Sequence, residues 1–325
     1  MVKSYYILDF IKFFMALVVV AIHAHPERSC QNEYLNYLLT NIVYPQAVPF
    51  FFVTSGFLLW RKIIDIPQPE KVKRINSFIQ KSLRLYIVWT LIYLPFTIYG
   101  FYTEETPFLK SLLIFLRNFT LVGENYLSWP LWYLLAMITG GICLIMMSNL
   151  HFSKIFTIAI FLYLTGIGLD YMQVYDENCF STFYFKLFKT TRNGFFVGFA
   201  YIMIGGLIAL YEQQKSSIYC YIVLFILGTI TSNYGIRIAS LVASYSFFKI
   251  ILWIKVSDKF KGIAENARMA STIIFLTHMI PIAIFRIFLP NMPSLATYIY
   301  SILFTVSISA TAIVFREKKI IKVLF

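Results

Sequence analysis

Charged residues are scarce in this sequence. They make up 13% of the 325 residues, whereas hydrophobic residues make up 59% and aromatic residues 19%. The apolar residues fall in long runs instead of the one-sided pattern of amphipathic soluble helices. The composition therefore indicates an integral membrane protein.

The sequence also lacks the short motifs that mark metal, nucleotide and nucleophile sites. Its four histidines do not have the H-E-x-x-H spacing, and its four cysteines include no C-x-x-C pair. It contains no G-x-S-x-G elbow, no P-loop and no dinucleotide-binding glycine pattern. We therefore expect no metal and no bound cofactor.

Cysteine is too sparse for a disulfide framework. Cys143 and Cys220 fall inside apolar runs and are expected to be packing residues. Cys30 and Cys179 fall in loops predicted to lie outside the cell, where a disulfide is chemically allowed. Two unpaired thiols agree with the sequence at least as well.

Windows of about twenty apolar residues predict an all-α polytopic protein with about ten transmembrane helices. The predicted spans cover residues 5–24, 41–60, 84–102, 129–147, 154–170, 195–211, 218–232, 236–254, 270–289 and 296–315. The apolar stretch 108–122 is interrupted by Lys110, Arg117 and Asn118, which favours an interfacial or re-entrant helix. No connection is long enough for a separate soluble domain, so residues 1–325 are predicted to form a single transmembrane domain.

The positive charge is distributed as in a membrane protein. A net charge of +13 could indicate a nucleic-acid partner, but the basic residues flank apolar spans and are not gathered in one soluble domain. Eighteen basic residues fall in one set of alternate loops and seven in the other. The positive-inside rule then places both termini in the cytoplasm. We expect the lipid bilayer, and no nucleic acid, as a partner.

The first span carries three polar residues that are costly in hydrocarbon: Asp9, Lys12 and His23. It lacks a small-residue cleavage site after it, so we expect a retained helix and not a removable signal peptide. On an α-helix the eleven-residue step from Lys12 to His23 puts both on one face, about 16 Å apart along the axis. The predicted topology places Lys12 toward the cytoplasm and His23 toward the outer face.

Each of these groups has a structural and a chemical interpretation. His23 can act as a general base toward a hydroxyl, or can simply bond a loop carbonyl at the interface. Asp9 and Lys12 are three residues apart and can form a structural ion pair. Lys12 can also help form a cationic entrance for an anionic ligand. Basic residues after the second span would strengthen such an entrance, or would serve only as a positive-inside anchor: Lys73, Arg74, Lys81 and Arg84.

Several segments together are similar, in order, to those of one family of membrane proteins. The family's hallmark is a basic residue, usually Arg, followed after ten intervening residues by a His, and residues 7–12 followed by His23 are similar to it. Further similar segments occur in the family's order at Pro49–Leu59, Lys81–Tyr86, Trp129–Leu134, Thr191–Phe196 with Gly205 and Gly206, and Phe275–His278. Together these segments resemble the acyltransferase family 3 membrane proteins. The resemblance covers almost the whole chain, and the ordered set is more specific than any one motif.

The resemblance implies transfer of an acyl group, commonly acetyl from cytoplasmic acetyl-CoA, to a hydroxyl of a cell-surface glycan or its lipid-linked precursor across the cell inner membrane. It implies His23 as the general base, with Asp9 positioning Lys12. It also implies that Lys12, Lys81 and Arg84 bind the phosphates of the CoA donor. The residues implied to contact the acceptor or to line the cavity are Ser55, Trp132, Arg192 and His278.

Other functions stay open at this point. Lys12 replaces the usual Arg and loses the two-pronged contact that a guanidinium makes with phosphate. The Arg192–Gly194 and Trp129–Trp132 segments also resemble the membrane domain of membrane-bound serine racemases, although the soluble racemase domain that would follow is absent here. A transporter or exporter of a small solute or glycan, and a non-catalytic relative that binds a partner, are the alternatives. The sequence does not determine the oligomeric state.

Overall fold

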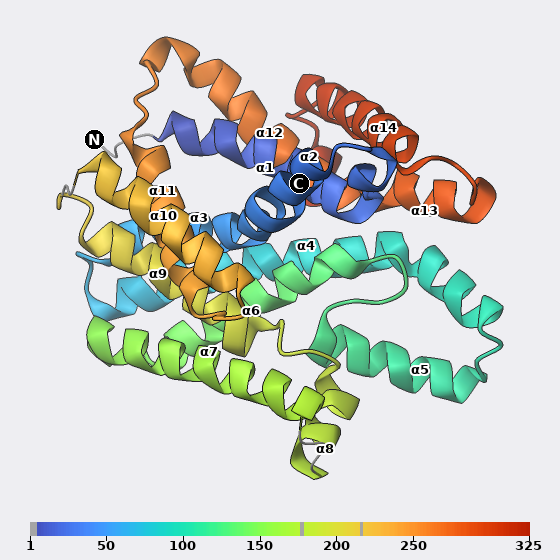
Figure 1. The fold of residues 1–325 in the computed structure, drawn as a ribbon, viewed down its shortest axis with the longest axis horizontal. Helices are drawn as coiled ribbons and strands as arrows, with labels where there is room; N and C mark the ends of the chain where they lie inside the picture. The colour runs from blue at the N-terminus through green and yellow to red at the C-terminus, as the bar shows by residue number, and fades with distance from the viewer. Residues whose placement is uncertain (1–4, 176–178, 215–216) are drawn as a thin grey trace. The chain divides into compact units, whose positions relative to one another are not determined.

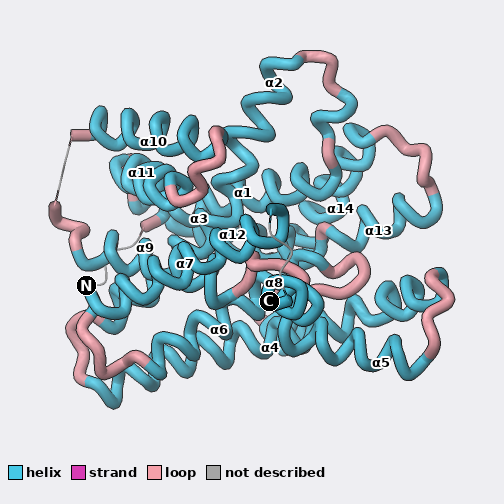
Figure 2. Tube along the Cα trace, turned by 60° about the horizontal axis from the view of Figure 1, so that its bottom comes forward, coloured by secondary structure: helices cyan, strands magenta, loops and turns pink. Residues whose placement is uncertain are grey.

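The structure is a computed structural model that describes residues 5–175, 179–214 and 217–325. Helices joined by loops make up this part of the chain, and no strand occurs in it (Figure 2). Within these described residues, seven helical stretches are long and apolar enough to cross a membrane, and three shorter apolar helices accompany them. The prediction of an all-α, multi-pass membrane protein is therefore confirmed. The count of ten spans and the cytoplasmic termini stay predictions.

The chain groups into two compact units, each described here by itself. Unit 1 combines residues 1–54 with residues 213–325, and unit 2 comprises residues 55–212. Unit 1 contains α1 (Tyr6–Ala24), α2 (Glu33–Leu38), the first half of α3 (Tyr44–Ile63), α10 (Ile218–Asn233), α11 (Ala239–Trp253), α12 (Lys261–Thr277), α13 (Met279–Phe288), α14 (Ser294–Val314) and α15 (Lys319–Leu324). Unit 2 contains the rest of α3 with α4 (Gln68–Thr103), α5 (Phe108–Arg117), α6 (Trp132–Met146), α7 (Phe152–Tyr175), α8 (Cys179–Phe188) and α9 (Phe199–Leu210).

In unit 1, α1 packs along α12 (Figure 1). Helix α1 ends where His25 takes a left-handed backbone conformation with φ of 57°, and Pro26 follows. This sequence stops the helix because proline has no N–H to continue it and disfavours helical geometry before it. His23 therefore lies in the last turn of α1, as predicted from the sequence.

Two helices differ from the predicted spans. Helix α4 begins at Gln68 and not near residue 84, because its basic first half is helical but polar, and a hydropathy window detects only the apolar half. The predicted span 270–289 is instead a longer segment in which α12 and α13 meet at His278. The stretch 108–122 forms the short helix α5 followed by a π-helical turn at Asn118–Val122, in agreement with its exclusion from the spans.

Glycines in unit 2 allow close helix packing. A Cβ added at Gly140 or Gly141 would lie 2.6 Å from the side chain of Ile202 or Ile79, and one at Gly206 would lie 2.6 Å from Trp60. The absence of a side chain at these three glycines therefore lets the neighbouring helices approach closely.

All four cysteines are free thiols, which agrees with the unpaired alternative for Cys30 and Cys179. Cys143 is buried, as a packing residue should be. Cys220 is exposed on α10, so its assignment as a packing residue is wrong. An apolar run shows that a helix is present but not which of its faces is covered.

Candidate functional site

One end of α1 carries an ion cluster. Asp9 is buried, and its two carboxylate oxygens lie 3.6 Å from Lys12 Nζ and 3.6 Å from Arg268 Nη1 of α12. The predicted pairing of Asp9 with Lys12 is therefore present, with a second cation that the sequence analysis did not include. Glu265 of α12 also acts electrostatically on Asp9, so this end of the α1–α12 pair gathers two cations and two carboxylates.

The other end of α1 carries two histidines. The ring centroids of His23 and His278 lie 5.3 Å apart. His278 is fully buried, and its Nδ1 lies 3.1 Å from the carbonyl oxygen of Ile274 and 2.8 Å from that of Phe275. Since carbonyl oxygens only accept hydrogen bonds, Nδ1 carries the proton and Nε2 presents its lone pair. Among the described residues this buried Nε2 has no hydrogen-bond partner.

The contacts at the two ends of α1 show how α1 and α12 run relative to each other. Asp9 meets Arg268, and fourteen residues further along α1 His23 meets His278, which follows Arg268 by ten residues. Helices α1 and α12 therefore run parallel, as the predicted topology requires of its first and ninth spans. Arg286 of α13 fixes the histidine end further, because its Nη2 donates a 2.8 Å hydrogen bond to the backbone carbonyl of His23.

A second polar cluster lies in unit 2. The Arg192 guanidinium lies over the Trp132 ring, 5.2 Å from Cζ to the centroid, and its Nη2 is 3.8 Å from Glu124 Oε2. Burial raises the pKa of Glu124 above its usual range, although the positive charges of Arg192 and Lys189 act in the opposite direction. Arg192 and Trp132, both predicted as acceptor or cavity residues, thus lie together, with Glu124 as an added partner.

The segment Thr191–Gly194 has a structural explanation at each position. Thr191 Oγ1 donates to Asp170 at 2.7 Å, and Asn193 Oδ1 accepts from the backbone N–H groups of Phe195 and Phe196, which caps the π-helical turn Gly194–Gly198. A Cβ at Gly194 would lie 2.9 Å from the carbonyl oxygen of Ala136. The segment therefore positions Arg192 by anchoring the residues on either side of it.

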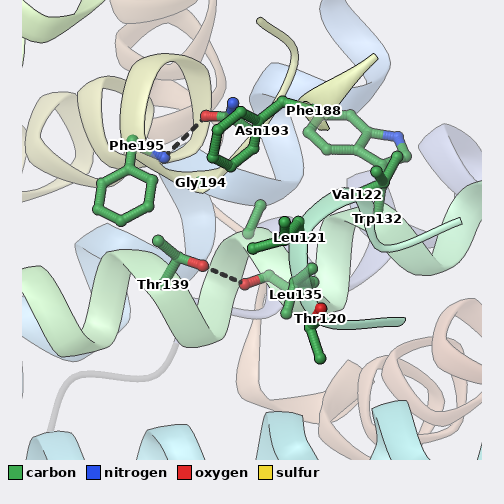
Figure 3. A pocket seen from close by; sticks show the side chains of 11 residues that line it. Thr120, Leu121, Val122, Trp132, Leu135, Thr139, Phe188, Asn193, Gly194 and Phe195 are labelled. Carbon is green, nitrogen blue, oxygen red and sulfur yellow. Dashed lines mark hydrogen bonds between the residues drawn. The ribbon is translucent and has the colours of Figure 1, made fainter. Parts of the chain in front are cut away.

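A small hollow lies beside this segment (Figure 3). Its lining includes Trp132 and Thr139 from α6, Phe188 from α8, and Asn193 with Phe195 from the capped turn. Its volume of about 50 Å³ is far below the roughly 300 Å³ at which ligand pockets begin. The hollow can hold a water or a side-chain fragment, but it does not hold a sugar in this conformation.

The remaining predicted site residues also lie in unit 2. Ser55 Oγ is 3.2 Å from the hydroxyl of Tyr133, one residue after Trp132. Lys81 and Arg84 are exposed on α4. Lys12 belongs to unit 1, so a donor site shared by Lys12, Lys81 and Arg84 stays a prediction. The roles assigned to His23, Asp9 and His278 likewise stay predictions.

Sequence reasoning missed three residues of these clusters: Arg268, Arg286 and Glu124. Arg286 is a charged residue inside a predicted apolar span, which is a signal for a functional or structural role. Arg268 was counted as a positive-inside residue, and only the packing of α1 on α12 connects it to Asp9. Glu124 lies in a loop with no motif, so no sequence signal identified it.

The fold and these clusters define a multi-pass helical membrane protein with polar side chains inside its helical units. The Acyl_transf_3 family model, described as an acyltransferase domain, matches residues 5–315. The chain belongs to this family of membrane acyltransferases.

The curated relatives carry other names. An amino-acid racemase of Enterococcus faecalis is 35% identical over 213 residues, which are 64% of this chain and 28% of that protein. A serine/alanine racemase of Enterococcus gallinarum is 30% identical over 218 residues, 64% of this chain and 30% of that protein. The chain thus matches less than a third of the length of either relative. No solved structure matches the chain significantly.

Proposed function

We propose that this protein is a membrane O-acyltransferase of the cell inner membrane that transfers acetyl from cytoplasmic acetyl-CoA to a hydroxyl of a cell-surface glycan or its lipid-linked precursor. The observation that carries the proposal is the arrangement along α1 and α12. An ion cluster with the cations Lys12 and Arg268 lies at one end of this parallel pair, and a histidine pair lies at the other. Family membership supports acyl transfer, and the two ends provide the two groups that such a transfer needs.

The histidine end would serve the acceptor. A neutral His23 nitrogen takes the proton of the acceptor hydroxyl as the oxygen attacks the thioester carbonyl carbon. A new C–O bond forms, the C–S bond breaks, and the CoA thiolate leaves and takes up a proton. The products are an O-acetyl ester and free CoA thiol, so atoms and charge balance without a metal or a redox partner.

His278 would act as a positioning residue for His23. Its Nδ1 proton is committed to backbone carbonyls, so its Nε2 can only accept a hydrogen bond. The neighbouring His23 ring can donate its single N–H to this atom. Such a bond leaves the lone pair of the other His23 nitrogen for the acceptor, and would stabilise the imidazolium that forms during transfer.

The ion cluster would serve the donor. CoA carries several phosphates, and Lys12 and Arg268 are the cations of this cluster that would contact such an anionic ligand. The axial distance of about 16 Å from Lys12 to His23 is of the order that an extended pantetheine arm covers. Lys81 and Arg84 on α4 are the further donor-binding candidates.

The names of the relatives favour a second candidate function. Proteins called amino-acid racemase and serine/alanine racemase align with 64% of this chain, which suits a membrane protein that handles or transports an amino acid. In that case, Glu124 and Arg192 offer opposite charges for the ammonium and carboxylate of such a solute. This alternative expects solute flux without consumption of acetyl-CoA.

Labelled acetyl-CoA distinguishes the two functions. Sealed inverted membrane vesicles containing the protein expose the cytoplasmic side to the label, and the lumen is then analysed for acetylated carbohydrate. Acyl transfer predicts label in the carbohydrate that depends on His23. Uptake of serine or alanine with no transfer of label would favour the transporter and contradict the proposal.

A further inference from the structure

Residues of two short helices of unit 2, α5 and α8, line a groove. Each helix has ten residues and is therefore about 15 Å long, half the thickness of a bilayer's hydrocarbon core. The groove has a volume of about 370 Å³, within the range of ligand pockets. It is separate from the residues assigned to acyl transfer.

The floor of the groove is apolar. Leu113 and Ile114 of α5 and Phe183 and Leu187 of α8 line it. The Leu113 side chain is 60% exposed and that of Phe183 is 65% exposed. Large apolar side chains with exposed fractions this high are expected where they face hydrocarbon. The floor of the groove therefore suits an acyl chain.

The rim of the groove is cationic. Lys110 and Arg117 lie seven residues apart on the groove face of α5, and Lys186 lies on α8. The lining contains no acidic residue, and no carboxylate in the described part of the chain pairs with these three cations. Three uncompensated charges beside an apolar floor form a surface for an anion that carries a hydrocarbon chain.

Arg117 gives this rim a fixed geometry. Its Nη1 donates to the backbone carbonyl of Lys186 at 3.1 Å, and its Nε and Nη2 donate to Asn118 Oδ1 at 3.2 and 2.8 Å. All these acceptors are neutral, so the guanidinium keeps its charge while bridging the two helices. Burial of nearby Lys189 lowers its pKa, and the positive charge of Arg117 lowers it further. Glu124 and Glu104 act in the opposite direction.

We propose that this groove is a binding site for an anionic phospholipid of the surrounding bilayer. The phosphate and its negative headgroup would lie against Lys110, Arg117 and Lys186, with an acyl chain on the apolar floor. A zwitterionic lipid neutralises its own phosphate with its ammonium group and therefore gains less from three cations. The proposal concerns lipid binding alone and does not depend on acyl transfer.

Native mass spectrometry of the purified full chain in detergent measures this site directly. Phosphatidylglycerol and phosphatidylcholine with identical chains are titrated onto the wild type and onto the double variant Lys110→Gln/Lys186→Gln, which leaves the structural bonds of Arg117 in place. We expect phosphatidylglycerol to bind the wild type more tightly than phosphatidylcholine does. The double variant should bind phosphatidylglycerol about tenfold more weakly.

The double variant Lys255→Gln/Lys259→Gln is the matched control, because it removes the same charge from exposed positions in unit 1. It should bind phosphatidylglycerol as the wild type does. Equal binding of the two lipids, an equal loss in the control, or unchanged binding in the groove variant would each overturn the proposal. A third titration uses a long-chain isoprenoid phosphate. If the groove variant lost binding of that lipid alone, the phospholipid assignment would be wrong.

Should the groove variant lose its folded state, the single variant Lys186→Gln replaces it. Lys186 is exposed, and its contact with Arg117 is made through its backbone carbonyl, which the substitution keeps. It should still weaken phosphatidylglycerol binding several-fold relative to phosphatidylcholine. Unchanged selectivity in this variant would contradict the site.

Discussion

The imidazole rings of His23 and His278 lie 5.3 Å apart, although the two residues are separated by 255 positions in the sequence. His23 lies in the last turn of α1, and His278 joins α12 to α13. The hydrogen bonds of His278 Nδ1 to backbone carbonyls leave its buried Nε2 as an acceptor. This pairing makes His23 more than an interfacial histidine, because its neighbour can select its tautomer.

The pairing predicts that His278→Ala lowers acyl transfer by about tenfold or more, with a changed pH dependence of kcat. Without the His278 acceptor atom, His23 loses the contact that is proposed to select its tautomer. The measurement is acetyl transfer in membranes between pH 5 and 9. Leu276→Ala also removes a buried side chain of α12 and serves as the control, with an unchanged pH profile. A purely structural role for His278 would reduce the amount of folded protein and leave the profile unaltered.

The ion cluster predicts a graded response at Lys12. Lys12→Arg keeps the charge beside Asp9 and should retain activity, whereas Lys12→Ala should raise the KM for acetyl-CoA about tenfold. Initial rates at varied acetyl-CoA concentration separate this effect from a fall in kcat. The same KM in all three proteins would remove Lys12 from donor binding.

The burial of Glu124 predicts a pH-dependent effect on stability. Its pKa is raised in the folded protein, so the stabilising effect of its protonated form is present at low pH and is lost as the pH rises through the folded pKa. Glu124→Gln imitates the neutral form and should raise the Tm at pH 7.5 by roughly 2 °C. At pH 4 the difference from the wild type should disappear.

Differential scanning fluorimetry in detergent at the two pH values measures this difference. Glu104→Gln, at an exposed loop position, is the control and should leave the Tm unchanged at both. A lower Tm for Glu124→Gln at pH 7.5 would show that the ion pair with Arg192 outweighs the cost of burying the charge.

Two glycines of unit 2 provide a matched pair for packing. A Cβ at Gly194 would lie 2.5 Å from Thr139 Cβ and 2.9 Å from the carbonyl oxygen of Ala136, so Gly194→Ala should destabilise the protein by about 1 to 3 kcal/mol. Gly168 on α7 has no atom within 4 Å of that position, so Gly168→Ala should be neutral or slightly stabilising. Thermal unfolding in detergent compares the two, and equal effects would contradict the packing described.

The sequence predicts those features that depend on composition and local spacing. The all-α class, α1 with its Asp9–Lys12 pair, and the short helix at Phe108–Arg117 all follow from runs of apolar residues and intervals of three or four positions. Features that depend on packing between distant helices do not follow. Arg268 beside Asp9 and His278 beside His23 require α12 to pack against α1, which no local pattern encodes.

The sequence also does not predict which side chains of a helix are exposed. Cys220 lies in an apolar run and yet is exposed on α10, because hydropathy does not distinguish a face that meets lipid from one that meets protein. Helix α4 extends sixteen residues before its predicted start at residue 84 for a related reason, since polar residues are good helix formers outside the hydrocarbon.

The central claim is that His23 is the base of an acyl transfer. The most direct measurement is the transfer of labelled acetyl from acetyl-CoA to membrane or surface carbohydrate by the wild type and by His23→Ala at equal membrane expression. The account predicts transfer by the wild type and its loss in the variant. Transfer at a near-normal rate by His23→Ala would contradict it.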